Sequence, residues 1–502
     1  MTQVRALATW LLLGVALAVG IGAQSPPAAP PALTADALFQ QTKVWTVHLT
    51  VSGDGWNKLT PAPTPPPPPP PSSPGAQPPP PPRPPTSIPA VLPADLLKQV
   101  LGGFLGPEGG RNGISAQRGV VFEYVHAAFD LDNRHFADVA VRAKGNGTFT
   151  PVARFPKPSL KIDLNKYVKG QELAGVSTIN LHNNITDASW MNEVLAFQLY
   201  RDAGVPAPRT AYARVYLTIK GGDANKYLGL YSLVENVDAD FIKSRFGVSG
   251  GALFKPVTLV PFRFLSQDWA DYNQMYDPKT ALTAADKQRV IDFSDLLSNA
   301  TKQVFEARVA EFLDLDAFAR YMAAVVWLAN PDSVLQQGQN YYAHLHPASH
   351  KFAFVPWDQD HSFGQFVPFT PAEAQQQLDV LHPWTSRFAG APFAAQLENN
   401  LLARTFALES FKRRYLTALA ALARTVTQPE RISKQVDTLG ALLGPIVAQE
   451  PKDGRVMAFA ESLGEAPFKR PINQNVTVIP IRVFVRARQA SVIAQLKALG
   501  VQ

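Results

Sequence analysis

The chain of 502 residues contains no cysteine. A disulfide, a thiol nucleophile and a cysteine-ligated zinc site are therefore excluded. A protein that works outside the cell without cysteine must be held together by its core alone. That is compatible with a bacterial exterior and less usual for a eukaryotic secreted protein.

The chain also has no dense run of lysine or arginine. It carries 47 basic and 40 acidic residues, which gives a formal net charge of +7. This basic bias is mild, and it does not form the concentrated patch that a nucleic-acid partner requires. We therefore expect no nucleic-acid ligand and an ordinary, slightly basic surface.

Long hydrophobic runs are absent except near the N-terminus, where residues 7–21 are almost continuously apolar. Arg5 precedes this run, and Gly22 and Ala23 offer small residues for cleavage. The pattern predicts a secretory signal at residues 1–23. An uncleaved N-terminal anchor is the alternative, because the run approaches the length of a membrane span. We expect export in a bacterium, to the periplasm, the cell surface or the medium, and no other integral membrane span.

Two sets of hydrolase signatures are missing as well. The chain has no Gly-x-Ser-x-Gly elbow for a serine hydrolase. Its histidines near residues 344–361 include one His-x-x-x-His pair, His346 and His350, but no His-Glu-x-x-His motif. A transition-metal hydrolase that uses these histidines with Asp358 and Asp360 therefore lacks the motif typical of zinc proteases.

Proline, by contrast, is abundant, with 45 residues and most of the excess at positions 61–85. Such a segment adopts solvated polyproline II structure and cannot form a core. We interpret it as an insert, at about residues 60–90, between early strands. It either tethers the protein to a wall or partner or is a tolerated flexible loop. A shorter Pro/Ala linker is expected at residues 24–37.

The rest of the chain predicts an α+β fold. Period-two alternation indicates strands at residues 44–51, 119–130, 136–142, 159–164, 214–217 and 228–234. Gly53-Asp54-Gly55 is expected to be a turn. Helical spacing appears at residues 187–199, 284–297, 304–313, 316–328, 393–405, 410–426, 430–446 and 482–499. One domain at residues 38–502 is expected, β-rich to about residue 236 and helical from about residue 237.

The most informative segment follows the apolar residues 354–357, where two carboxylates, Asp358 and Asp360, are spaced i, i+2. On a strand this spacing directs both side chains to the same side. Two carboxylates at such a short distance repel each other unless a cation binds them. Mg²⁺, which prefers oxygen ligands, is the natural candidate. The alternative is a strand end with solvated acids.

Asp332 and Asn340 precede this pair, after an apolar helical run. A loop Asp, a later Asn and then an Asp after a strand is the order used in phosphoryl transfer. In that chemistry the first Asp handles the substrate hydroxyl, and the Asn and second Asp bind metal.

At this point the sequence resembles the CotH (spore coat protein H) kinase-like family. The resemblance is close over roughly residues 118–365. It rests on segments 181–184, 187–193, 204–209, 229–235, 330–333 and 356–360. It implies an atypical, bilobal protein-kinase-like fold that uses ATP and Mg²⁺ or Mn²⁺ to phosphorylate a Ser/Thr-rich protein. A non-catalytic surface or coat scaffold on the same fold is the alternative.

With this resemblance, further residues acquire expected roles. Glu193 sits between apolar residues and needs a partner, for which we favour Lys161 with Lys157 as the alternate. Such a lysine would also contact the α- and β-phosphates. Arg142 and Lys144, beside Gly145, are expected to contact phosphates. Glu235 would lie in the hinge that binds adenine. Asp332 would be the catalytic carboxylate, with Asn340, Asp358 and Asp360 as metal ligands. Gln339 departs from the family pattern, where a histidine is expected.

Overall fold

The computed structural model describes residues 33–61, 91–145, 149, 157–367, 370–384, 390–451, 454–470 and 473–501. The expected signal at residues 1–23 and nearly all of the proline-rich insert lie outside these ranges. None of the helices in the described part of the chain is long and apolar enough to cross a membrane. Short helix α1 (Ala35–Leu38), capped by the Thr34 hydroxyl, begins inside the segment expected to be a linker.

Seven strands form a closed barrel in the order β1-β2-β3-β4-β5-β7-β6. Their bounds are Val44–Ser52, Val125–Leu131, Arg134–Lys144, Ser159–Asp163, Thr178–His182, Lys226–Glu235 and Thr210–Lys220. All neighbours are antiparallel except β1 and β6, which close the barrel in parallel. Alternate apolar residues, among them Leu49, Phe129, Val141, Ile162 and Leu181, fill the interior. The other face of several strands is therefore free to contact the rest of the chain.

The chain leaves the barrel between β1 and β2. Helix α2 (Gly53–Leu59) begins where a turn was expected at residues 53–55, because the Ser52 hydroxyl accepts a hydrogen bond from Gly55 N at 3.0 Å and caps the helix. Helices α3 (Ala94–Leu101) and α4 (Ile114–Gln117) then follow. Leu97 and Leu101 of α3 belong to the core of the helical part, not to the barrel.

The second part is mainly helical. Its helices are α5 (Asn192–Asp202), α6 (Ala239–Phe246), α7 (Ala270–Tyr276), α8 (Ala284–Asn299), α9 (Lys302–Phe312), α10 (Leu315–Leu328), α11 (Ala372–Gln376), α12 (Asn400–Phe406), α13 (Glu409–Thr425), α14 (Pro429–Val447), α15 (Arg455–Ser462) and α16 (Ile481–Ala498). Two small sheets accompany them: β8 (Ala252–Phe254), β9 (Tyr341–Leu345) and β10 (Phe352–Pro356), and then β11 (Phe468–Arg470) with β12 (Asn473–Val478). The expected α+β class is confirmed.

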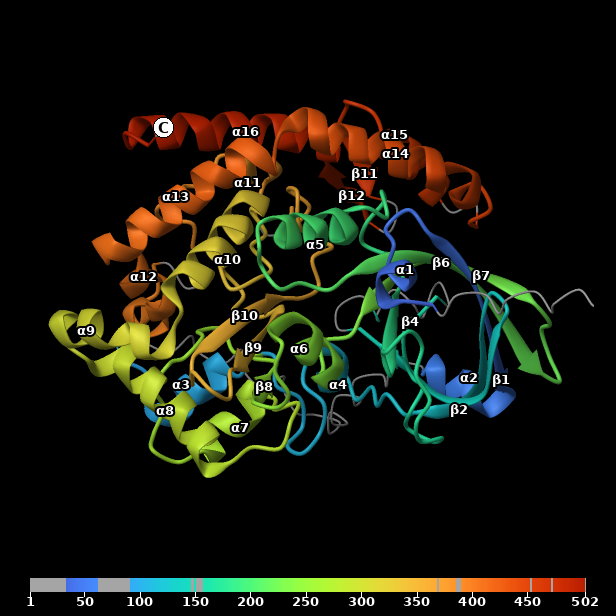
Figure 1. Ribbon diagram of the computed structural model, residues 1–502, viewed down its shortest axis with the longest axis horizontal. Helices are drawn as coiled ribbons and strands as arrows, with labels where there is room; N and C mark the ends of the chain where they lie inside the picture. The colour runs from blue at the N-terminus through green and yellow to red at the C-terminus, as the bar shows by residue number, and fades with distance from the viewer. Residues whose placement is uncertain are drawn as a thin grey trace, which may run out of the picture.

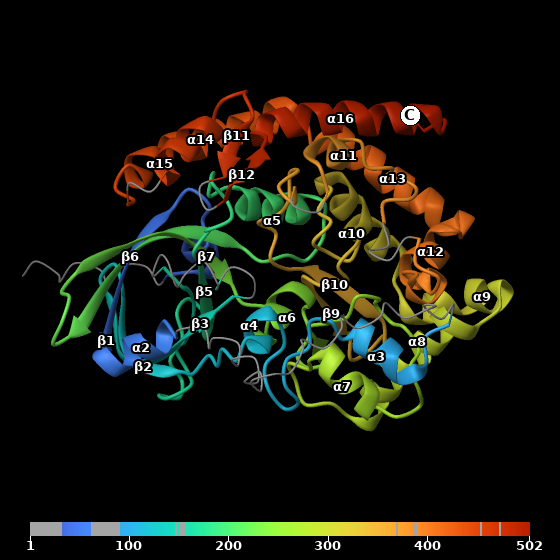
Figure 2. The ribbon, with the colours of Figure 1, turned by 180° about the vertical axis from the view of Figure 1, so that it is seen from behind.

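Figures 1 and 2 show the barrel at one side of the molecule and most of the helices at the other, with α14 and α15 extending above the barrel and α5 below α14 and α16. The large hydrophobic core includes Tyr212, Leu230 and Val234, which lie on barrel strands but outside its interior. The helical part therefore packs against the outer face of the barrel. The candidate site lies along this junction.

Candidate active site

The outer face of strands β3, β4 and β5 supplies a row of polar side chains. Leu160 and Ile162 point into the barrel, so alternation turns Lys161 outward. Across the ladder Lys161 lies opposite Arg142 on one side and Asn180 on the other. Burial, reinforced by the Arg142 charge, lowers the pKa of Lys161 to about 8. This face therefore concentrates positive charge where little water can screen it.

At the ends of β3 and β5, three side chains form a continuous hydrogen-bonded chain. The Lys144 Nζ lies 2.6 Å from His182 Nε2, and His182 Nδ1 lies 2.7 Å from Glu193 Oε2. Lys144 also donates to Asn180 Oδ1 at 3.3 Å and lies over the ring of Trp357. His182 and Glu193 are both buried. The buried glutamate thus has a partner, as its apolar neighbours in the sequence require.

That partner is not the expected one. Glu193 pairs with His182, whereas Lys157 forms a buried ion pair with Glu450 at 3.1 Å. Lys161 is on the expected face but is opposite Asn180, two residues before His182 on β5. Lys161 is therefore level with the middle of β5, whereas α5 approaches the end of that strand. The expected pairing of Glu193 with Lys161 or Lys157 is wrong in this geometry.

The β9–β10 hairpin brings Asn340 next to the Asp-x-Asp segment. Trp357 N donates to Asn340 O at 3.0 Å, which continues the ladder by one residue. Asn340 and Asp358 both have positive φ, +61° and +54°. Residues other than glycine adopt this conformation rarely, and such positions cluster at functional sites. The hairpin thus places two of the three predicted metal ligands, Asn340 and Asp358, close to each other at the ends of paired strands.

Asp332 lies on the loop after α10 and joins this group. Asn340 Nδ2 donates to the Asp332 carbonyl at 2.9 Å, and Gln339 Nε2 donates to Asp332 Oδ1 at 3.0 Å. Burial raises the pKa of Asp332, while His361 opposes the rise and Asp358 and Asp360 add to it. The glutamine that departs from the family pattern therefore orients the predicted catalytic carboxylate directly.

Asp360 is tied to the segment that leads into α5. Its carboxylate accepts a hydrogen bond from the Thr186 hydroxyl, and its carbonyl accepts one from Asn192 Nδ2 at 2.9 Å. Asn192 and Glu193 are the first two residues of α5. The start of this helix consequently contacts both the acidic loop and the basic face of the barrel.

A group of potential cation ligands lies where the acidic loop and the barrel meet. His182, Glu193 and Asp358 each offer one ligand atom, and these atoms lie within 4.8 Å of one another. Glu193 Oε1 is buried with no hydrogen-bond partner in the described part of the chain. Burial, and next the Asp358 charge, raise the pKa of Glu193 to about 8. Carboxylate and imidazole donors in a desolvated site fit a divalent cation, but the Lys144 ammonium already contacts His182 here.

Lys255, which follows β8, is a further cation in this region. Burial and the charge of Lys279 lower its pKa to about 8, while Asp358 opposes that change. Its ammonium lies 5.6 Å from the ring centres of both Tyr342 and Trp357. Lys144 and Lys255 therefore approach Trp357 and Asp358 from two different elements.

Two other expected ligands have different surroundings. The Glu235 carboxylate is buried and forms ion pairs with Arg209 and Arg245. Its N–H donates to Arg209 O at 3.0 Å, so this side chain and N–H are already engaged within the protein. Arg142 Nη1 donates to Ala143 O at 3.0 Å, at the entrance to the expected phosphate loop. Residues 146–148 of that loop lie outside the described residues.

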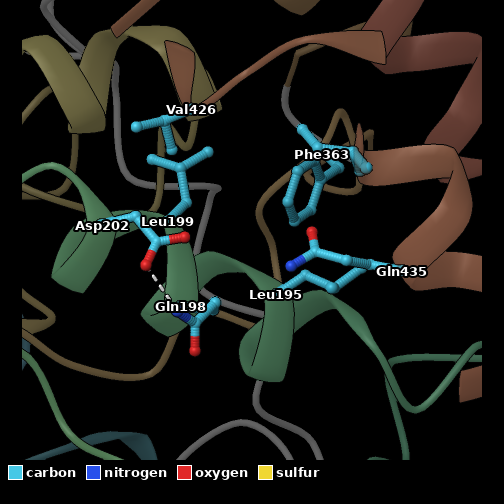
Figure 3. A pocket seen from close by; sticks show the side chains of 8 residues that line it. Leu195, Gln198, Leu199, Asp202, Phe363, Val426 and Gln435 are labelled. Atoms are coloured by element: carbon cyan, nitrogen blue, oxygen red, sulfur yellow. Dashed lines mark hydrogen bonds between the residues drawn. The ribbon is translucent and has the colours of Figure 1, made fainter. Parts of the chain in front are cut away.

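A small groove lies on the far side of α5 (Figure 3). It is lined by Leu195, Gln198, Leu199 and Asp202 from α5, and by Phe363, Val426, Ile432 and Gln435. Gln198 donates to Asp202 at 2.6 Å across its floor. At 100° per residue these α5 positions face away from Glu193. The groove is therefore separate from the candidate site.

Sequence reasoning missed two residues of the site, His182 and Lys255. His182 ends the run of residues 178–182, in which Ile179 and Leu181 alternate with polar side chains, and this alternation could have indicated β5. Lys255 carries no such local signal. Its position depends on how the β8–β9–β10 sheet packs beside the barrel.

Comparison with known proteins identifies the class of protein that has this site. A family model described as CotH kinase protein matches residues 141–492. The chain therefore belongs to the CotH family. It is also similar to a protein named inner spore coat protein H from Bacillus subtilis (strain 168), at 21% identity over 332 residues. The aligned region covers 64% of this chain and 80% of that relative.

Proposed function

We propose that this protein is an ATP- and Mg²⁺-dependent phosphotransferase that acts on Ser or Thr residues of a protein. The observation that carries the proposal is the meeting of two faces of opposite charge. Asp332, Asn340 and Asp358 come from one loop and one hairpin, and they lie near the cationic strand face that holds Lys144. Phosphoryl transfer requires both an anion-binding face and metal-binding carboxylates.

In this proposal the barrel is the front lobe and the helical part is the back lobe of a kinase-like fold. Lys144 and Lys161 contact the phosphates, and Arg142 adds charge to the same face. Mg²⁺ or Mn²⁺, held by Asn340, Asp358 and Asp360, neutralises phosphate charge when bound. Asp332 orients the acceptor hydroxyl and takes its proton. The γ-phosphorus gains a bond to the Ser or Thr oxygen and loses its bond to the leaving ADP.

The coat is the proposed setting. The relative's name places that relative in the inner spore coat. We extend the same kind of location, a coat or surface layer of a bacterium, to this chain. An acceptor rich in Ser or Thr within such a layer fits the chemistry.

Transfer from γ-labelled ATP to a Ser-rich peptide tests the activity. We expect Asp332→Asn to abolish transfer and leave nucleotide binding within a few-fold of the wild type. Asp358→Asn should weaken binding of the metal–nucleotide complex itself. Asp292→Asn, on the exposed face of α8, is the matched control and should behave as wild type. Equal transfer by all four proteins would contradict the assigned roles.

A non-catalytic coat component on the same fold is the second candidate, favoured by the relative's name as a coat protein. A thermal shift with Mg-ATP separates the two. Ligand at 100 times its Kd stabilises a protein by about 2.7 kcal/mol. An unchanged melting temperature at millimolar Mg-ATP or Mn-ATP would favour the structural role.

A further inference from the structure

The hydrogen-bonded side chains of Lys144, His182 and Glu193 connect three separate elements, β3, β5 and α5. In kinases with a direct ion pair, a strand lysine contacts a helix glutamate. Here an imidazole ring stands between the two, with contacts of 2.6 Å to the lysine and 2.7 Å to the glutamate. No contact of this kind is available to Lys157, whose ammonium is held by Glu450.

The neighbours of His182 define its protonation. Burial lowers the pKa of Lys144 well below its ordinary value and, with the Asp358 charge, raises the pKa of Glu193 to about 8. When the pair is charged, His182 Nε2 accepts from Lys144 and Nδ1 donates to Glu193; when the pair is neutral, the ring takes the other tautomer and keeps both contacts. Burial and the Lys144 charge favour the neutral ring, because they lower the pKa of His182 to about 3. Both ring nitrogens are thus used, and the ring orientation depends on both partners.

We propose that His182 is a positioning residue that transmits the placement of Glu193 to Lys144 and so aims this lysine at the nucleotide phosphates. The inference rests on the proposed phosphotransferase function. It assigns the phosphate-contacting role to Lys144, ahead of Lys161 and Lys157. Any movement of the start of α5 turns the ring and releases the lysine. The Asp360 contacts of Thr186 and Asn192 hold that start in place.

The hydrogen-bond chain and a metal ion exclude each other at this point. The atoms of His182, Glu193 and Asp358 that could surround an ion include those that Lys144 and the imidazole already use. The lysine ammonium supplies the positive charge that the two carboxylates require.

The first test needs no nucleotide. Nitrogen-15 NMR of histidine-labelled full-length protein reports which ring nitrogen carries the proton, and His182→Asn assigns the signal. We expect a neutral ring with one protonated nitrogen in the wild type and a changed signal in Glu193→Gln. A ring protonated at both nitrogens near neutral pH, or a signal that Glu193→Gln leaves unchanged, would overturn the proposal. This readout stands even if the protein proves to bind no nucleotide.

The second test is a double-mutant cycle on the Kd of Mg-ATP, measured by calorimetry. His182→Asn retains a donor near Glu193 and removes the acceptor for Lys144. We expect it to weaken binding about 10-fold or more, as for loss of a charge-assisted hydrogen bond. In a Lys144→Met background the same change should have less than about a 2-fold effect, since no lysine remains to be aimed.

The matched control is His126→Asn on the exposed edge of the barrel, which should leave the Kd unchanged. An equal effect of His182→Asn with and without Lys144 would assign the histidine a purely structural role and overturn the proposal. Loss of Mn²⁺ binding in His182→Asn, with the affinity for ATP unchanged, would also overturn it, because the three ligands would then serve a metal. Absence of ATP binding by the wild type would count against the proposed function and not against the NMR result.

Discussion

Two buried lysines of the candidate site, Lys161 and Lys255, have pKa values lowered to about 8 from an ordinary value of 10.5. Burial is the main cause in both. A bound triphosphate would supply the missing negative charge and raise both pKa values. Above pH 8 the free lysines are partly neutral, so binding must take up protons. We expect net proton uptake between about pH 8 and 10, and little at pH 6.5, where both are already charged.

Calorimetry in buffers with different ionisation enthalpies measures this uptake. Lys161→Met should reduce the uptake at pH 8.5 by removing one of the contributing groups. Lys226→Met is a useful control, because this exposed lysine pairs with Asp223 and should not take part. Buffer-independent enthalpies for the wild type at pH 8.5 would show that neither lysine approaches the phosphates.

Two substitutions at Asp358 can separate the effect of losing its carboxylate from the effect of its strained backbone conformation. Its φ of +54° is tolerated by Asn far better than by Ala. We therefore expect Asp358→Asn to unfold at nearly the wild-type denaturant midpoint, and Asp358→Ala to lose about 1 kcal/mol of stability. Both should lose metal–nucleotide affinity. If the two variants are equally stable, the positive φ is not a constraint at this position.

At the scale of single elements, the sequence predicts those whose burial follows a regular period. The strand expected at residues 44–51 and the helices expected at residues 284–297 and 410–426 correspond to β1, α8 and α13 within two residues at either end. Their apolar residues face one core along their whole length. The helix expected at residues 393–405 is only partly formed. A 3-10 turn (Ala394–Leu397) precedes α12, and Asn399 caps the latter through Leu402 N.

The candidate site was predictable to the extent that its residues follow one another in the chain. Asp332, Asn340 and Asp358 belong to one loop and one hairpin, so local order was enough to suggest them. The partner of Glu193 was not predictable in this way. It depends on the register of β4 against β5 and on where α5 meets the barrel. One residue of register decides which side chain reaches the helix.

The start of α5 depends on Asp187, which lies in the segment before this helix. Its carboxylate accepts from Ser189 N, the Ser189 hydroxyl and Asn192 N, at 2.8, 2.6 and 2.8 Å. Asp187→Ala leaves these buried donors without an acceptor. We expect a loss of about 1 to 3 kcal/mol in the free energy of unfolding, measured by urea titration. Asp223→Ala, in an exposed pair with Lys226, should cost less than about 1 kcal/mol.

At the scale of the whole molecule, Glu450 joins the two parts of the fold. It follows α14 and reaches the barrel, where it accepts from Leu230 N at 2.5 Å and pairs with Lys157 and Arg455 at 3.1 and 3.5 Å. Its side chain is fully buried. Removing one member of such a group leaves buried charges without compensation.

We therefore expect Glu450→Ala to lower the free energy of unfolding by about 3 to 5 kcal/mol. Exposed Glu461→Ala on α15 should change it by less than about 0.5 kcal/mol. Hydrogen exchange should show faster opening of β7 together with α14 in the Glu450 variant. Faster exchange in α14 alone would mean that Glu450 stabilises its own helix and does not join the two parts.

The proline-rich insert also bears on the whole molecule, because its two flanks belong to different cores. Strand β1 and helix α2 precede it at the barrel, whereas α3 follows it and packs in the helical core, with Lys98 paired to Asp271 at 2.6 Å. Closing a loop depends only weakly on its length, so replacing residues 61–85 by about ten Gly and Ser residues should change stability by less than about 1 kcal/mol. We expect unchanged Mg-ATP affinity and a melting temperature within a few degrees of the wild type.

The length of the replacement supplies the control. A link too short to reach from the barrel to α3 must pull this helix off the helical core, and the melting temperature should then fall. A large fall even with the longer link would mean that the prolines pack on the folded protein and contribute to its stability. If the shortened protein folds and binds ATP but no longer attaches to the cell or coat surface, the insert is a docking segment. That result would separate attachment, at the insert, from chemistry, at the junction of barrel and helices.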